Sequence, residues 1–248
     1  MRTVVIAGGT RGIGGALASL LEARGWRVVA LGSADGDLSS VPATTALISR
    51  LPSSIDALVL SAGWFSHRRV MTPDGLERSF AVNVLARHLL VDGLRPALER
   101  SASPVVLNLC GVGGIRAGRI HWEDPSLERG YSLFAATMQG ARAVDLLGVG
   151  YPARYPGSPV RYVLYNPLLV NSGMHRNFPQ PRRAVIGAAA ALFGHSTARA
   201  AAPLVSLVES PPDAPVTALR RGRPVALPSA AESERMYEMV AALATSPG

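Results

Sequence analysis

The sequence predicts a single α/β domain over residues 1–248, built on a doubly wound parallel sheet flanked by helices. Three observations carry this prediction. Short, continuous apolar runs alternate with longer segments of helical spacing. A glycine-rich turn separates the first apolar run from the first helical segment. The length of 248 residues, with 48% hydrophobic and 17% charged residues, suits one large domain and excludes a disordered chain.

The expected strands are buried on both faces, because each is a continuous apolar run rather than an alternating one. In chain order they span 3–7, 26–31, 57–60, 105–109 and 161–165. Helical spacing predicts helices over 15–24, 74–100, 133–148, 182–193, 196–208 and 229–245. The interval 32–56 has room for only one small helix, so one crossover is abbreviated. Proline and glycine concentrate at 150–159 and 209–228, which predicts loops there.

The net charge of +8 rests entirely on 25 arginines, because the chain contains no lysine. Guanidinium groups do not deprotonate near neutral pH, so any mechanism that needs a lysine amine is excluded. The arginines are scattered and form no basic helix face with interleaved aromatics. We therefore expect no nucleic-acid partner, and attribute the charge to a solvated surface or to a site for a phosphorylated cofactor.

Other features of the composition indicate a cytoplasmic protein without a metal. The single cysteine, Cys110, fits a reducing compartment. The longest apolar stretch, 184–193, is too short to span a bilayer, and no signal peptide precedes the first strand, so we expect no membrane partner. The histidines lack the spacing of metal ligands.

The glycine turn Gly8-Gly9-Thr10-Arg11-Gly12-Ile13-Gly14 directly follows the first strand and opens the first helix. Residues without a Cβ let the backbone approach a pyrophosphate, whose charge the amides and dipole of the helix N-terminus stabilise. This order of elements predicts a dinucleotide site of the Rossmann type. The residues expected to bind the cofactor there are Gly8, Thr10, Arg11, Gly12, Ile13 and Gly14.

The choice of cofactor depends on the end of the second strand, which reads Gly32-Ser33. An acidic residue there would bond the adenosine ribose and repel a 2′-phosphate. Its absence, together with Arg11 and Ser33 as phosphate partners, favours NADP(H) and leaves NAD(H) open. Asp37, followed by Leu38, is either a partner of the adenine amino group or an exposed turn aspartate.

Taken together, these stretches resemble the short-chain dehydrogenase/reductase superfamily. Residues 8–14 match its glycine motif, and Ser61-Ala62-Gly63 stands where the family has Asn-Ala-Gly. Further stretches resemble the retinol-dehydrogenase-like branch: 72–83 with His88-Leu89-Leu90, 118–122, 166–167 with 171–174, and the closing helix 232–243. The resemblance spans almost the whole chain.

The resemblance implies a nicotinamide cofactor, carbonyl or alcohol chemistry on a small-molecule substrate, and assembly as a homodimer or homotetramer. It also implies a substrate lid around 171–200 and further cofactor contacts from Ser61, Ala62, Gly63, Pro167 and Val170.

The family's catalytic set is an asparagine, a serine, a tyrosine and a lysine. Asn83 matches the asparagine, whereas Gly111, beside Cys110, aligns with the serine. Three alignments are open for the tyrosine and lysine positions: Tyr131/Ala135, Phe134/Met138 and Thr137/Ala141. We prefer the third, because Tyr131-Ser132 then falls on a Tyr-Ser pair that this branch often carries. No alignment supplies a lysine, and Gly111 stands in place of the serine. In the preferred alignment the usual tyrosine is missing as well.

The candidate proton donors are therefore Tyr131, Thr137, Cys110 and a water held by Asn83 or Asn108. Tyr131 has the most suitable hydroxyl, but it faces a different side of the helix from Thr137 unless the chain bends.

Two function classes stay open. The first is an atypical NADP(H)-dependent ketoreductase of secondary metabolism, for example in antibiotic biosynthesis. The second is a redox-neutral enzyme, such as a cyclase or dehydratase, or a cofactor-sensing protein without catalysis. The intact glycines and Asn83 favour the first class, and the missing Tyr-Lys pair favours the second.

Overall fold

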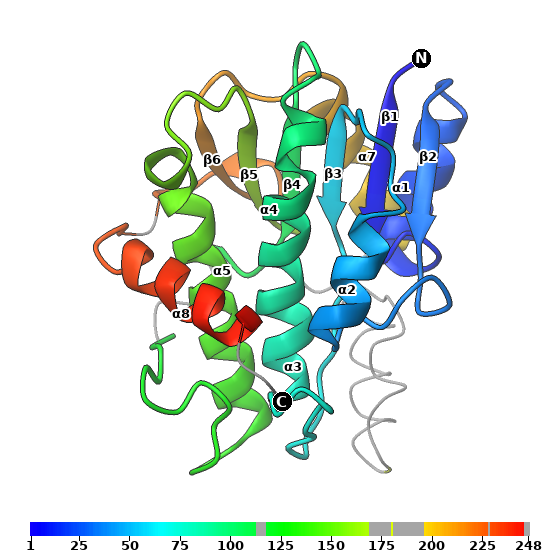
Figure 1. The fold of residues 1–248 in the computed structure, drawn as a ribbon. Coiled ribbons are helices and arrows are strands. Elements are labelled where there is room, and N and C mark those ends of the chain that lie inside the picture. The colour runs from blue at the N-terminus through cyan, green and yellow to red at the C-terminus, as the bar shows by residue number, and fades with distance from the viewer. Residues whose placement is uncertain (113–117, 169–179, 181–195, 228, 246–248) are drawn as a thin grey trace.

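A computed structural model describes residues 1–112, 118–168, 180, 196–227 and 229–245. Its centre is a seven-stranded sheet with the order β2-β1-β3-β4-β5-β6-β7 (Figure 1). All neighbouring strands pair in parallel except β6 and β7. The strands are β1 (Thr3–Ala7), β2 (Arg27–Leu31), β3 (Ala57–Leu60), β4 (Val105–Leu109), β5 (Arg161–Asn166), β6 (Val216–Arg220) and β7 (Arg223–Pro224). The predicted doubly wound parallel sheet is confirmed.

Helices cover both faces of the sheet (Figure 1). On one face, α1 (Gly12–Glu22) packs against α7 (Thr197–Glu209). The other face carries α2 (Val41–Ile48), α4 (Ala86–Leu98) and α5 (Leu133–Arg154), and α8 (Ser233–Thr245) lies outside α5. A short helix, α3 (Arg78–Phe80), continues through a π-helical segment, η1 (Ala81–Leu85), into α4. None of the described helices is both long and apolar enough to cross a membrane.

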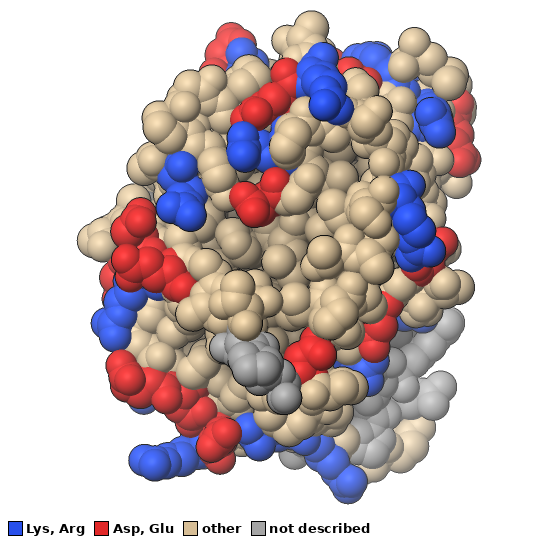
Figure 2. All heavy atoms as spheres, viewed as in Figure 1, with Lys and Arg blue, Asp and Glu red and all other residues tan. Residues whose placement is uncertain are grey.

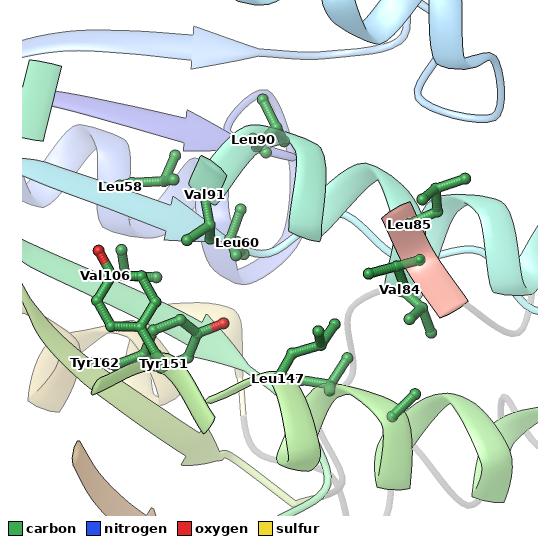
Figure 3. Packing of buried hydrophobic residues seen from close by; sticks show 14 of the residues in the cluster. Leu58, Leu60, Val84, Leu85, Leu90, Val91, Val106, Leu147, Tyr151 and Tyr162 are labelled. Atoms are coloured by element: carbon green, nitrogen blue, oxygen red, sulfur yellow. The ribbon is translucent and has the colours of Figure 1, made fainter. Parts of the chain in front are cut away.

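Successive strand residues bury their side chains on opposite faces of the sheet. Leu58 and Leu60 of β3 join the core under α4 and α5, whereas Ala57 and Val59 join the core under α1 and α7. Figure 3 shows the first of these cores, where side chains of η1, α4 and α5 meet those of β3 and β4. Because both faces are covered, the strands are apolar throughout, as the sequence predicts.

Charged residues on the α4 and α5 face lie mostly around its rim (Figure 2). Basic and acidic side chains alternate there, and the centre of the face is uncharged. The basic excess of the chain is therefore not gathered into one patch on this face.

The structure corrects two of the expected elements. The predicted loop at 209–228 is wrong in its middle, because β6 pairs with β5 from Val216 opposite Tyr162 onward. This short run among prolines becomes a strand through a long-range partner, which local pattern does not show. The helix expected from residue 74 begins only at Arg78, because the Glu77 carboxylate caps it by accepting from the amides of Ser79 and Phe80. The helix expected over 182–193 lies outside the described residues.

Candidate active site

The turn after β1 meets the end of β3 at the point where the strand order reverses. In open parallel sheets, ligands bind in the crevice at such a point. The amides of Ser61 and Ala62 both donate to the carbonyl of Ala7, at 2.9 and 2.8 Å. A Cβ on Gly8 would lie 2.6 Å from the nitrogen of Ala62, and one on Gly14 would lie 2.3 Å from the oxygen of Gly8. Glycine is therefore required here by the packing of the turn itself.

The N-terminus of α1 opens onto a groove. Arg11 is the N-cap residue, and its side chain makes no capping hydrogen bond. The first amides of α1, beginning with Gly12 and Ile13, have no intrahelical acceptor. The groove above them has a volume of about 420 Å³, and Gly9, Thr10 and Arg11 contribute to its wall. Unpaired amides, a positive helix end and an open groove fit a pyrophosphate.

The end of β2 carries an acidic group that sequence reasoning missed. The Asp35 carboxylate folds back and accepts from the amide of Gly32 at 2.7 Å, beside the exposed Ser33. Asp37 accepts from the amide and hydroxyl of Ser39, at 2.9 and 2.7 Å, and these bonds hold its pKa below the ordinary value. The sequence signal for the bond from Gly32 to Asp35 is an aspartate four residues after the end of the strand, beside glycines.

Leu38 lines a narrow, mostly apolar pocket between the ends of β1 and β3 and the start of α4. Ala62, Val82 and Arg87 form other parts of its wall. The pocket is too narrow to admit a ligand ring as it stands.

Asn83 lies in the π-helical segment η1, a kind of turn that frequently marks functional sites. Its Oδ1 accepts from the amide of Trp64, and its Nδ2 donates to the carbonyl of Trp64, each at 2.8 Å. Both polar atoms are therefore engaged in holding the loop that follows β3, which includes Gly63.

Asn108 and Cys110 lie at the end of β4. The buried Asn108 donates from Nδ2 to the hydroxyl of Tyr162 at 2.8 Å. Burial raises the pKa of the Cys110 thiol to about 12; the charge of Asp145 adds to this, and that of Arg87 opposes it. The thiol thus stays protonated near neutral pH and is a weak acid.

The two candidate hydroxyl donors are both bonded to backbone carbonyls. Tyr131 donates to the carbonyl of Ser66 at 2.9 Å, and Thr137 donates to that of Leu133 at 2.7 Å. Burial, and then the charge of Glu77, raises the pKa of Tyr131. This direction is opposite to the one that brings a general acid toward neutral pH.

The sheet-facing side of α5 can be followed from Gly148, which packs against Leu164 and Tyr162 of β5. Ala141 lies two helical turns before Gly148, and Thr137 lies one turn before Ala141, so the three share a face. Phe134, in contrast, is 67% exposed. This placement supports the alignment Thr137/Ala141, which stays a prediction.

Sequence reasoning also missed two residues that join the ends of strands. Asn166 donates from Nδ2 to the carbonyl of Val112 and accepts from the amide of Leu168, each at 2.9 Å, which ties the loops after β4 and β5. Pro167 stands between Asn166 and Leu168. Val170 and most of the expected lid lie outside the described residues, and the lid's last residues begin α7.

Arg87 of α4 joins the ends of β3 and β4. Its Nη1 donates to Oδ1 of Asn108 at 2.5 Å and to the carbonyl of Leu109 at 2.6 Å. Its Nη2 donates to the carbonyl of Ala62 at 2.6 Å. The sequence signal for it is a charged residue four positions after Asn83, about one helical turn further on. No group of three metal-ligating side chains occurs in the described part of the chain.

Fold and glycine turn together define the class: a Rossmann-type α/β protein with its crevice at the reversal of strand order. No protein-family model matches the chain. "Dehydrogenase/reductase SDR family member 12" of Bos taurus is 34% identical over 85 residues, which cover 34% of this chain and 26% of the relative. The protein of the same name from Homo sapiens is 35% identical over 75 residues, covering 30% and 23%. The chain thus spans about a quarter of the length of the curated relatives it matches.

Solved structures share the fold over nearly the whole chain. An uncharacterised protein of Mycobacterium paratuberculosis has a TM-score of 0.74 at 21% identity, over 100% of this chain and 94% of that one. The 3-alpha-hydroxysteroid dehydrogenase of a Pseudomonas species, complexed with NADH, has a TM-score of 0.69 at 21% identity, over 89% and 96%. A 3-ketoacyl-(acyl-carrier-protein) reductase of Brucella melitensis, also with NADH, has a TM-score of 0.60 at 18% identity, over 89% and 98%.

The chain is similar in sequence to a short-chain dehydrogenase/reductase over a third of its length, and it shares the fold of solved dehydrogenases. Its place in the retinol-dehydrogenase-like branch stays a prediction.

Proposed function

We propose that the chain is an NADP(H)-dependent oxidoreductase that reduces a carbonyl group of a small molecule with an atypical catalytic set. One observation carries this proposal: the glycine turn and the uncapped N-terminus of α1 border an open groove, which continues along α1 beside β2 and α7. Two solved structures of similar fold are complexes with NADH, which supports a nicotinamide cofactor. A bound dinucleotide would supply the hydride for the carbonyl carbon, while the carbonyl oxygen takes a proton.

Different residues of the chain bind different parts of the dinucleotide. The amides at the start of α1 hold the pyrophosphate, and Gly8 and Gly14 keep the turn close against β3. Leu38, which follows β2, flanks the adenine half. The nicotinamide half then lies over the ends of β3, β4 and β5, where Asn83 and Asn166 act as positioning residues.

The preference for NADP(H) is tested by titration calorimetry with NADPH and NADH. We expect tighter binding of NADPH, because Arg11 stands at the groove with no capping role. Arg11→Gln is expected to weaken NADPH about tenfold and to leave NADH nearly unchanged. Asp35→Asn is expected to strengthen NADPH, because its carboxylate lies at the end of β2. Arg24→Gln, just beyond the C-terminal end of α1, is the control. Equal affinities for both cofactors would contradict the preference.

The proton donor is tested with Tyr131→Phe. We expect carbonyl reduction to slow by about a hundredfold or more, with NADPH affinity intact, because only the hydroxyl is removed. Tyr155→Phe is the matched control: this tyrosine lies at the other end of α5, and its hydroxyl donates to Asp92. An unchanged rate in Tyr131→Phe would transfer the role to Thr137, Cys110 or a held water.

A second candidate is a redox-neutral enzyme or a cofactor-sensing protein. The bonding of Tyr131 and Thr137 to backbone carbonyls, together with the absence of lysine, favours it. Oxidation of NADPH, followed by its absorbance across a panel of ketones and aldehydes, separates the two candidates. Binding of NADPH without turnover of any carbonyl would support the second. A specialised-metabolite substrate, a cytoplasmic location and a homodimer or homotetramer are further parts of the proposal.

A further inference from the structure

A buried cation without a carboxylate partner lies at the ends of β3 and β4. The guanidinium of Arg87 is held by three neutral oxygens, those of Ala62, Asn108 and Leu109. Its Nε is buried and has no hydrogen-bond partner among the described residues. No ion pair between described residues includes Arg87, and every aspartate and glutamate of the chain lies in the described part.

The positive charge at this position is therefore left uncompensated by the fold. Burial lowers the pKa of Arg87, but a guanidinium group keeps its proton in proteins. An unpaired charge is costly in a poorly solvated place. The three carbonyl bonds explain where the side chain points, but they do not neutralise it.

The charge lies where the ends of β3 and β4 meet. Arg87 bonds the carbonyls of Ala62 and Leu109, which follow or end these strands. It also borders the narrow pocket that Leu38, after β2, lines. If the proposed function holds, the nicotinamide half of the dinucleotide lies over the strand ends that Arg87 joins.

We propose that Arg87 makes this site selective for the reduced nicotinamide over the oxidised one. The oxidised ring carries a positive charge and the reduced ring does not, while both forms share the adenine, riboses and phosphates. An uncompensated cation nearby therefore raises the Kd of the oxidised form without an equal effect on the reduced form. The site would load reduced cofactor and release oxidised cofactor, which favours carbonyl reduction. Arg87 is thus a specificity-determining positioning residue, and this inference rests on the proposed dinucleotide binding.

The other titratable groups near Arg87 do not compensate its charge at pH 6, because they are mostly neutral at that pH. Burial raises the pKa of Cys110 and of Tyr162, so both are neutral near pH 6. The charge of Asp145, on α5, also raises the pKa of Cys110. Burial raises the pKa of Asp145 itself to about 7. At pH 6 most of Asp145 is protonated, so the measurement is made there.

The experiment compares Kd values for oxidised and reduced cofactor, NADP⁺ with NADPH and NAD⁺ with NADH, by titration calorimetry at pH 6. In the unaltered protein we expect the oxidised form to bind about tenfold more weakly. Arg87→Met is expected to bring this ratio toward one. Arg87→Lys keeps a charge and is expected to keep most of the ratio. Arg95→Met, on the same helix but paired with Glu99, is the control and leaves the ratio unchanged.

Asn108→Asp is a second test, which neutralises the charge of Arg87 while the guanidinium stays in place. The new carboxylate would face Nη1 of Arg87, so it is expected to stabilise the fold and to lower the ratio. It decides the question if Arg87→Met does not fold. A ratio near one in the unaltered protein, or one unchanged in Arg87→Met and Asn108→Asp, would overturn the inference but not dinucleotide binding. If the ratio of the two Kd values also falls to one in Arg87→Lys, the selectivity depends on the bonds to the carbonyl oxygens and not on the charge. That result would also overturn the inference. Failure to bind either form would overturn the proposed function, and this inference with it.

Discussion

Gly14→Ala is expected to lower the free energy of unfolding by about 3 kcal/mol or more. The added Cβ would lie 2.3 Å from the oxygen of Gly8 and 3.0 Å from its carbon, so the backbone of the turn must move. For a chain of this length the loss corresponds to a Tm lower by about 6–12 °C. Thermal and urea unfolding, followed by circular dichroism, measure it. Cofactor binding is expected to fail in the same variant, because the turn moves with it.

Gly140→Ala is the matched control, since it changes the same residue type within a helix. A Cβ on Gly140 would lie 3.8 Å from Cγ2 of Val84, which is an ordinary contact. Alanine is the better helix former by about 1 kcal/mol, so this variant is expected to be as stable as the unaltered protein or more so. A Gly14→Ala protein as stable as Gly140→Ala would contradict the packing of the turn against β3.

Asp145→Asn is expected to stabilise the protein at pH 8 and to change little at pH 4. Asp145 is buried on α5, and its Oδ1 has no hydrogen-bond partner among the described residues. Burial raises the pKa of this carboxyl to about 7, above the ordinary value near 4. Because the folded state then binds the proton more tightly than the unfolded state, stability falls as the pH rises from about 4 to about 7 and is level above that.

The size of this effect follows from the two pKa values. One pKa unit corresponds to about 1.4 kcal/mol, so ionised Asp145 costs the fold at most about 4 kcal/mol at pH 8. Urea unfolding at pH 4, 6 and 8 measures the loss, and Asp145→Asn is expected to flatten the dependence. Asp213→Asn, at an exposed side chain, is the control. An equal pH dependence in the unaltered protein and Asp145→Asn would show that the carboxyl ionises freely.

Local sequence predicts the parts of the fold that depend on neighbours in the chain. The strand, glycine turn and helix over residues 3–22 follow from an apolar run, glycines and helical spacing that all lie within one stretch. The early strands are predicted well because a strand buried on both faces must be apolar throughout. β6 escaped prediction because its partner, β5, lies about fifty residues earlier in the chain.

Some features of the candidate site were also predictable from the sequence, and others were not. Composition alone excludes a catalytic lysine, because the chain has none. The cofactor turn from Gly8 to Gly14 is also readable, since its residues are consecutive. Asp35 was missed because its carboxylate reaches Gly32 only when the turn after β2 folds back.

By itself the sequence determined an α/β sheet, a glycine turn after its first strand and the absence of lysine, because these depend on residue types and on short spacings. Only the tertiary structure showed which charge is buried without a carboxylate partner in the described part of the chain. Arg87 reads as one arginine among 25, until the parallel strands bring the ends of β3 and β4 together around it. A charge acquires its effect from burial and from the absence of a partner, and both are properties of the folded chain.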